Sequence, residues 1–509
     1  MRRILLYIFI YVNYFAAFGQ EKYWVLFDGK DLNSSPAISE KCKENRILLG
    51  LSPNQLSDLP VSKHYISELQ NTDIEVLNKS RWLNGVSAKL TNIQISKLKN
   101  LSFIKAIIPI DSKIQIAKID KNHNDELRVD YVMKQIGIEG FLHSDLTGKG
   151  ITIGVIDAGF YGTNDSPPLS HLFKENKILS VRDYINPQKT NHFEIQETYS
   201  DFHGTEVLAA ITGKDLKDNV QLGAATDATF YLARTDSGNR EFRGEEDNWV
   251  AAMEWMDSLG VRLINTSLGY AKGFTNPKEN YKPEQMDGKT SLISKAAQIA
   301  IEEKGMTIVV SAGNEGDDKD WKIVSTPADV EGIISVGATN DAGLKMGYSS
   351  IGPDFLQYVK PDVSCFSLFG TSLAAPVITG FVACLMQSNP KLTNKQIKKI
   401  LEESSNIYPY GNNFVGYGVP NASKALSLSM GNEIDRKVRK IEVNEGEKTI
   451  EVAVPQNEEL VIFNKKNSFV VVSQDTQKSK YNLIQLKRNS QVKQTTIVCR
   501  NELIEVFWK

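Results

Sequence analysis

"ITIGVIDAGF", residues 151–160, is a short apolar run that ends in an acidic residue and a glycine-containing turn. Four further apolar runs follow it, and amphipathic segments separate some of them. We interpret five runs as buried strands: Ile151–Ile156, Thr229–Ala233, Val261–Asn265, Met306–Ala312 and Ile333–Ala338. The segments 245–260 and 289–305 end at glycine, as helices often do. This alternation predicts an α/β fold, with a parallel sheet and helices on both faces.

Four polar residues stand after the predicted strands or before apolar helices, where sites gather in open parallel sheets. They are Asp157, His203, Asn314 and Ser372. Taken singly, each has an ordinary structural explanation. The aspartate can cap or turn, the histidine can be a loop or core residue, and the asparagine lies in the glycine-flanked turn "SAGNEG".

Ser372 also has either a structural or a catalytic explanation. It precedes an apolar helical pattern in "LFGTSLAAPVITGFVACLM", residues 368–386. A serine here can cap the helix by accepting hydrogen bonds from free N–H groups. It can also be a nucleophile, because the helix N-terminus stabilises a developing oxyanion. Alone, this stretch favours the cap.

The presence of an aspartate, a histidine and a serine in one chain favours the nucleophile over the cap. A serine hydroxyl needs a base to become a nucleophile, a histidine supplies it, and a carboxylate fixes the imidazole. Asn314 can donate to the oxyanion beside the N–H of Ser372. Asp157, His203 and Ser372 follow one another in an order known for such triads. We therefore expect Ser372 to start the helix and also to be the nucleophile.

These residues lie in motifs that resemble those of the subtilisin-like serine peptidases (the subtilase or S8 family), which carry an N-terminal inhibitory propeptide. The resemblance covers about residues 131–430. Its motifs are "GKGITIGVIDAGF" (148–160), "HGTEV" (203–207), "SAGNEG" (311–316) and "GTSLAAP" (370–376). Residues 20–118 resemble the propeptide more loosely, in size and in "NGVSAKL" (84–90).

The resemblance implies a role for each residue. Asp157 would orient His203, His203 would act as general base and then acid, Ser372 would attack the scissile carbonyl, and Asn314 would complete the oxyanion hole. It also implies that the substrate cleft is framed by Ser267, Leu268, Gly269, Ser311, Ala312 and Gly313. An extended peptide would pair with backbone groups there, and an open S1 pocket would take large apolar residues.

The chain departs from the family pattern at Glu206 and Val377, where relatives often have histidine. Neither position belongs to the triad. No cofactor is required for the implied reaction. Calcium is allowed as a structural ion, but no loop is rich enough in Asp and Asn to name its ligands.

The N-terminal residues 1–19 have the pattern of a signal peptide: Arg2 and Arg3, an apolar run over 4–12, and small residues before Gln20. The run is too short for a membrane span of about 20 residues. We expect export to the periplasm, the cell surface or the medium. No later run looks long and apolar enough to span a bilayer.

The remaining chain divides into three parts. Residues 20–118 are predicted as a small α+β propeptide, 119–430 as the three-layer peptidase domain, and 431–509 as a small antiparallel β-domain with period-two alternation. The polar stretch 112–130 is the predicted region of propeptide cleavage.

Composition limits the possible partners. The 509 residues carry a net charge of −2, which gives no electrostatic case for binding nucleic acid. Cys42, Cys365, Cys384 and Cys499 are too scattered for a disulfide scaffold or a zinc site. Cys365 and Cys384 either pair or stay as buried thiols.

The sequence thus predicts a secreted serine endopeptidase, made as a self-processing zymogen, that acts on polypeptides and is inhibited by its own propeptide. Three alternatives stay open. The chain can be a catalytically silent binding scaffold. Its main role can lie in the C-terminal β-domain, as an adhesion, sorting or docking module. It can also be a maturation protease dedicated to one exported partner.

Overall fold

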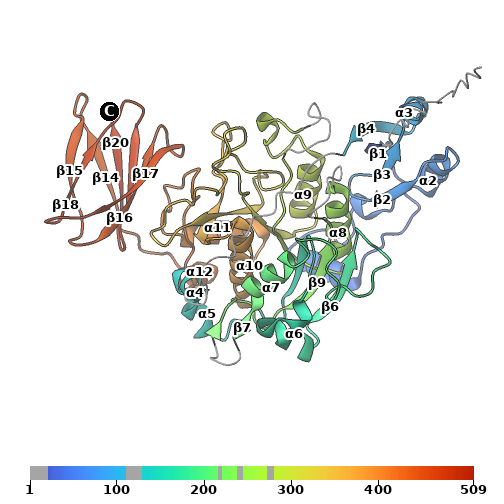
Figure 1. The fold of residues 1–509 in the computed structure, drawn as a ribbon, viewed down its shortest axis with the longest axis horizontal. Coiled ribbons are helices and arrows are strands. Elements are labelled where there is room, and N and C mark those ends of the chain that lie inside the picture. Colours follow the sequence, from blue (N-terminus) through green and yellow to red (C-terminus); the bar gives the residue numbers. More distant parts are fainter. Residues whose placement is uncertain (1–20, 111–128, 216–219, 238–244, 272–279) are drawn as a thin grey trace, which may run out of the picture.

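The computed structural model describes the chain except for residues 1–20, 111–128, 216–219, 238–244 and 272–279. The predicted signal peptide and most of the predicted cleavage region fall outside the described residues. Figure 1 shows an N-terminal sheet and a C-terminal sheet at opposite ends of the molecule, with a larger sheet between them.

The N-terminal sheet is antiparallel, with strand order β2-β3-β1-β4. Its strands and three helices give this region the small α+β structure that the sequence predicts for residues 20–118. The elements are β1 (Glu21–Phe27), α1 (Glu40–Leu48), α2 (Lys63–Gln70), β2 (Val76–Ser80), β3 (Gly85–Leu90), α3 (Asn92–Leu98) and β4 (Ile104–Pro109). This small α+β unit has a hydrophobic core of its own.

The central sheet is parallel throughout, with strand order β13-β12-β11-β10-β5-β9-β6. All five predicted strands are present. The sheet contains β5 (Thr152–Asp157), β6 (Ile178–Asp183), β9 (Thr229–Arg234), β10 (Leu263–Thr266), β11 (Thr307–Ser311), β12 (Ile334–Thr339) and β13 (Val363–Phe366). The sequence analysis missed β6 and β13, since edge strands need no long apolar run.

Helices cover both faces of this sheet, so the predicted α/β fold is confirmed. Helices α8 and α9 share one hydrophobic core with strand residues such as Ile156, while α7 and α10 share the other core with Val155. The helices and the short hairpin of this region are α4 (Val129–Gln135), α5 (Glu139–Leu142), α6 (Ser170–Lys174), α7 (His203–Thr212), β7 (Lys214–Asp215), β8 (Val220–Gln221), α8 (Glu246–Ser258), α9 (Leu292–Glu302), α10 (Thr371–Ser388), α11 (Asn394–Ser404) and α12 (Ala422–Ser429).

Helix α10 corrects one sequence-based expectation. By length and composition it is apolar enough to cross a membrane, although no such run was expected after the N-terminus. However, 83% of it is buried inside the protein, so it packs as a core helix.

The C-terminal residues form a β-rich unit, as predicted, but its pairing is not purely antiparallel. Strand β14, which the sequence analysis missed, pairs in parallel with β20, the last strand of the chain. Parallel neighbours need a long connection, and the intervening strands supply it. The strands are β14 (Val438–Val443), β15 (Thr449–Ala453), β16 (Glu459–Lys465), β17 (Val471–Lys478), β18 (Leu483–Lys487), β19 (Gln494–Val498) and β20 (Leu503–Trp508).

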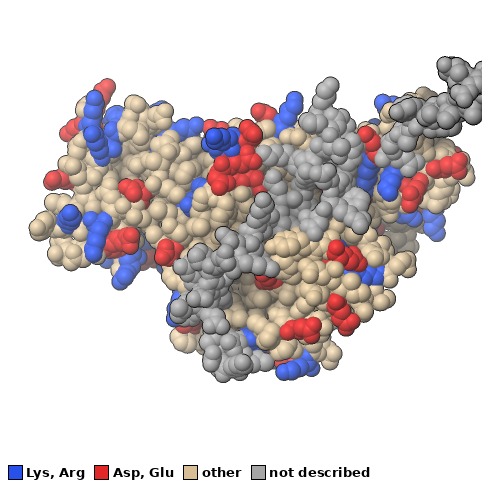
Figure 2. All heavy atoms as spheres, in the orientation of Figure 1, with Lys and Arg blue, Asp and Glu red and all other residues tan. Residues whose placement is uncertain are grey.

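Two predictions from composition can be compared with the structure. All four cysteines are buried and free, so Cys365 and Cys384 do not pair. On the face drawn in Figure 2, basic and acidic side chains of the described residues are interspersed, and the basic ones form no continuous patch.

Candidate active site

The candidate site lies at the carboxyl ends of the central strands. Strand β5 stands between β10 and β9, and the chain order reverses on its two sides. Ligands bind at such a switch point in open α/β sheets. Asp157 is the last residue of β5, Ser267 follows β10, and Ser311 ends β11. The strand order therefore brings these sequence-predicted residues to one edge.

His203 is the first residue of α7, and close backbone packing holds it beside β5. The N–H of Gly204 donates to the carbonyl oxygen of Gly159 over 2.9 Å, and a Cβ at Gly204 would collide with that oxygen. Nδ1 of His203 and Oδ1 of Asp157 are 2.7 Å apart, and both side chains are buried. The N–H of Ala158 also donates to Oδ1 of Asp157, at 2.8 Å. The carboxylate thus fixes the Nδ1–H tautomer and leaves Nε2 to accept a proton.

The electrostatics of this pair favour a strong base. Burial opposes the charge on His203, but the charge and hydrogen bond of Asp157 outweigh burial, and Glu206 acts in the same direction. The pKa of His203 is therefore raised above 6.5. A raised pKa makes the imidazole a better proton acceptor from a serine hydroxyl.

This shift predicts the acid side of the pH profile. Because only neutral His203 can act as the base, kcat/KM should fall as pH drops through a midpoint above 6.5. Glu206→Gln removes a charge that raises the pKa, so the midpoint should move to lower pH. The measurement is kcat/KM on a small peptide across pH, with exposed Glu433→Gln as the control. Equal midpoints in the two variants would contradict the role of Glu206.

Ser372 lies in the first turn of α10, and the structure contradicts the interpretation that it is a cap. The N-cap residue is Gly370, whose φ of 120° favours glycine, and no side chain caps the helix from that position. Instead, Oδ1 of Asn314 accepts from the N–H of Thr371 at 2.9 Å and from its hydroxyl at 3.1 Å. Oγ of Ser372 is buried and has no hydrogen-bond partner among the described residues.

The same bonds orient the amide of Asn314. Because its oxygen is held by the start of α10, its NH₂ group is the part left to act as a donor. Nε2 of His203, like Oγ of Ser372, is buried and has no partner within the described part of the chain. Catalytic hydrogen bonds are often long before substrate binds. The described residues thus form two pairs: His203 contacts Asp157 at the end of β5, and Asn314 contacts the turn of α10 that carries Ser372. No hydrogen bond joins His203 to Ser372 among the described residues.

The predicted cleft residues lie at the carboxyl ends of β10 and β11, and two of them contact the start of α10. Oγ of Ser267 donates to the carbonyl oxygen of Ser372 over 2.9 Å, and the N–H of Gly313 donates to Oγ1 of Thr371 over 3.1 Å. The side chains of Leu268, Ser311 and Ala312 are buried. A Cβ at Gly269 would collide with Ser325. The two segments thus both contact the start of α10.

Arg234 is a supporting residue that the sequence analysis missed. This buried arginine donates to the carbonyl oxygen of Ala158, at 3.0 Å, and to carboxylates of Asp183, Glu197 and Asp201, at 3.1, 2.8 and 3.0 Å. It thereby ties the turn after the candidate aspartate to the segment before the candidate histidine. The available signal was an arginine that directly follows a predicted buried strand.

No metal centre can be assigned here. Within the described residues, no group of three or more His, Cys, Asp or Glu side chains could hold a metal ion. We therefore name no calcium ligand and derive no step through a metal.

Two family models and several known proteases match this chain. A model of the subtilase family matches residues 148–418, and a model of the peptidase S8 propeptide domain of Bacteroidota matches residues 22–126. Subtilisin NAT of Bacillus subtilis subsp. natto is 26% identical over 409 residues, covering 77% of this chain and 93% of that protein. Serine protease AprX of Bacillus subtilis strain 168 is 25% identical over 326 residues, covering 55% and 67%.

Two solved structures share the fold. The epidermin leader peptide processing serine protease of Staphylococcus aureus has a TM-score of 0.55 at 17% identity, covering 82% of this chain and 99% of that one. Fervidolysin of Fervidobacterium pennivorans has a TM-score of 0.53 at 18% identity, covering 94% and 70%.

Proposed function

The chain belongs to the subtilase family of serine peptidases and has an S8 propeptide domain, and on this premise we propose that it is an exported, self-processing zymogen. The predictions of the family and of a serine-type endopeptidase are confirmed. The proposal assigns residues 1–19 to a signal peptide, 20–118 to the propeptide, 119–430 to the peptidase domain and 431–509 to a β-domain.

The proposed reaction is peptide hydrolysis through an acyl-enzyme. Oγ of Ser372 attacks the scissile carbonyl carbon while Nε2 of His203 takes the hydroxyl proton. Asp157 holds the imidazole and stabilises its positive charge. The amide of Asn314 donates to the oxyanion, and His203 then protonates the leaving amine. Water repeats the attack on the ester and releases the second product. The buried 2.7 Å contact of Asp157 with His203 is the observation that carries this assignment.

The proposed cleft lies between the segments Ser267–Gly269 and Ser311–Gly313. A bound peptide would be extended and would pair with backbone groups of these two segments. Polypeptides are thus the proposed substrates, and no particular partner is favoured among them.

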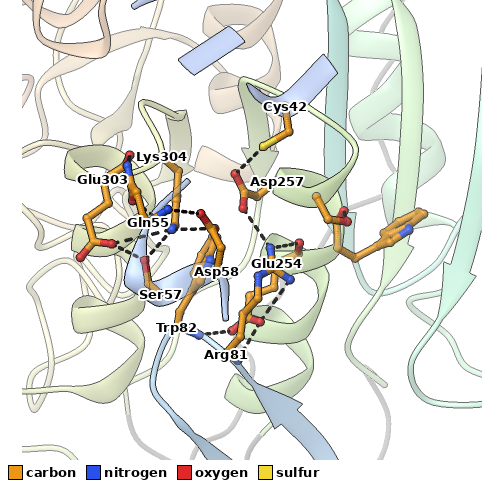
Figure 3. A network of polar contacts seen from close by, with 12 residues as sticks. Cys42, Gln55, Ser57, Asp58, Arg81, Trp82, Glu254, Asp257, Glu303 and Lys304 are labelled. Atoms are coloured by element: carbon orange, nitrogen blue, oxygen red, sulfur yellow. Dashed lines mark hydrogen bonds and ion pairs between the residues drawn. The ribbon is translucent and has the colours of Figure 1, made fainter. Parts of the chain in front are cut away.

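The propeptide is proposed to block the cleft, and its contacts with α8 hold it against the peptidase domain. Glu254 of α8 is buried and accepts from the hydroxyl of Ser80, at 2.6 Å, and from the N–H groups of Arg81 and Trp82, at 3.0 and 3.1 Å. Figure 3 shows Arg81 and Trp82 directed at this helix. Ile110, near the end of β4, belongs to the same hydrophobic cluster as the cleft residue Leu268.

A buried network of charges also joins the propeptide to the peptidase domain. Arg46 of the propeptide bonds Asp58 through Nη1, at 2.6 Å, and Asp257 of α8 through Nη2, at 3.0 Å. Lys304, just after α9, reaches Asp58 over 2.9 Å. Burial acts against ionisation of Asp58, yet Arg46 and Lys304 hold its pKa below its usual value. Each charge is matched across the interface, which suits a tightly docked inhibitor.

A fluorophosphonate probe, which phosphonylates only an activated serine hydroxyl, tests the proposal. We expect mature wild-type enzyme to gain one probe on the peptide that contains Ser372. His203→Ala is matured by a tagged wild-type enzyme that is then removed. It keeps the hydroxyl but loses its base, and should not be labelled at a measurable rate. The measurement is peptide mass mapping after a fixed reaction time. Equal labelling of both proteins would contradict His203 as the base. No labelling of a folded wild type would leave the silent scaffold as the better account.

A further inference from the structure

The C-terminal β-domain contacts the peptidase domain through strand β17 and the loop before it. The side-chain amide of Gln474 accepts from the N–H of Lys345 and donates to its carbonyl oxygen, both at 2.9 Å. The N–H of Val471 donates to Asn413 over 2.9 Å, and the N–H of Asn413 donates to Phe469 over 2.8 Å. The β-domain is therefore hydrogen-bonded to two peptidase segments, one of which begins at Lys345.

Lys345 holds the turn that follows it. Its ammonium group donates to the carbonyl oxygens of Met346, Gly347 and Ser349, at 2.8, 2.9 and 3.0 Å. It also lies 5.5 Å from the ring centre of Phe414, which packs with residues of the β-domain. Three bonds from one cation to one turn fix the conformation of that turn.

The segment 345–350 is also hydrogen-bonded to the loop that carries Asn314. The N–H of Gly316 donates to the carbonyl oxygen of Tyr348 over 2.7 Å. The N–H of Ser350 donates to the carbonyl oxygen of Gly313 over 3.1 Å. Oγ of Ser350 donates to Glu315, 3.1 Å away, and the same carboxylate oxygen accepts from the N–H of Asn314 at 2.9 Å. Both sides of Asn314 are thus anchored to this one segment.

Tyr348 extends the contact to the turn before Ser372. Its hydroxyl accepts from the N–H of Gly370, at 3.0 Å, and donates to the carbonyl oxygen of Ser367, at 2.8 Å. The segment 345–350 therefore contacts both the loop of the proposed oxyanion donor and the backbone that presents the proposed nucleophile.

We propose that Gln474 and Lys345 are positioning residues for the oxyanion hole, so that the C-terminal β-domain completes the active site. This inference rests on the proposed role of Asn314. It differs from an independent adhesion or docking module, because the β-domain acts here on the chemical step. Reacting groups must be held within about 0.5 Å of the productive geometry, and a 1 Å displacement costs as much as about 10²-fold in rate.

The test compares Gln474→Leu, which has a similar size but neither hydrogen bond, with Gln477→Leu on the same strand. We expect kcat on a small peptide to fall about tenfold in Gln474→Leu, with unchanged KM, since an interaction made only in the transition state is weakened. Gln477→Leu should match wild type, and the melting temperatures of the two variants should agree. Lys345→Met is the second variant and should show the same change in kcat.

A double-mutant cycle separates positioning from general destabilisation. Asn314→Ala alone should lower kcat by about 10²–10³-fold, the loss expected for one oxyanion donor. If Gln474 acts through Asn314, then adding Gln474→Leu to Asn314→Ala should lower kcat no further. An equal tenfold loss in both backgrounds would overturn the inference, as would a Gln474→Leu enzyme that behaves like Gln477→Leu. If Asn314→Ala itself keeps full activity, the proposed function fails instead.

Discussion

Replacement of Ser372 by alanine is expected to abolish peptide hydrolysis while leaving the fold intact. Removal of the nucleophile lowers kcat by about 10⁶-fold in subtilisin, a relative of this chain, which corresponds to about 8 kcal/mol of transition-state stabilisation. Folding should not suffer, because Oγ of Ser372 has no hydrogen-bond partner within the described residues. The measurement is kcat on a chromogenic peptide, together with the melting temperature.

Because the variant cannot mature itself, it is matured by a tagged wild-type enzyme that is then removed. Ser388→Ala is the matched control, since it makes the same change at the other end of α10. Full activity is expected for Ser388→Ala. Substantial hydrolysis by Ser372→Ala would mean that another residue is the nucleophile.

The second large effect is expected at the interface between the propeptide and the peptidase domain. Arg46→Met removes a cation that is 1% exposed and leaves Asp58 and Asp257 with one cation fewer. Breaking a buried ion pair costs about 3–5 kcal/mol, and we expect the lower end because Lys304 and Arg81 still contact the two carboxylates. A loss of about 3 kcal/mol raises the population of undocked propeptide by about 10²-fold.

This population can be measured as the rate at which an added protease cuts the propeptide of the Ser372→Ala chain, since such cleavage follows the open fraction. The protease should not cut after basic residues. Lys43→Met is the control, because Lys43 lies on the same helix and pairs with exposed Glu40. An exposed pair contributes less than about 1 kcal/mol. Equal cleavage of the two variants would contradict a docking role for Arg46.

Much of the peptidase fold could be predicted because its central strands are buried on both faces. Runs such as Thr229–Ala233 and Met306–Ala312 are apolar almost throughout, and glycine ends the intervening helices. Edge elements lack this signal, which is why β6 and β13 were missed. The parallel pairing of β14 with β20 joins residues such as Val438 and Leu503, which lie far apart in the sequence, and no local pattern predicts that contact.

In the candidate site, too, residues with a local sequence signal could be predicted and residues that depend on distant contacts could not. Asp157, His203, Asn314 and Ser372 could be selected because the reaction needs these residue types and their motifs are local. The cap interpretation of Ser372 was wrong, because Asn314, from a distant loop, satisfies the start of α10. Arg234, Lys345 and Gln474 act through contacts between segments far apart in the sequence, and their types carry no chemical signature. Supporting residues of this kind become visible only in three dimensions.

The central claim is that Ser372 is the working nucleophile of a chain that matures itself. The most direct measurement is the intact mass and the N-terminal sequence of purified wild type beside Ser372→Ala, each expressed with its propeptide. We predict that wild type loses the residues up to a cut between about 112 and 130, and that Ser372→Ala keeps them. If both proteins are folded and exported yet keep the propeptide, or if both lose it at the same site, self-processing by Ser372 is contradicted.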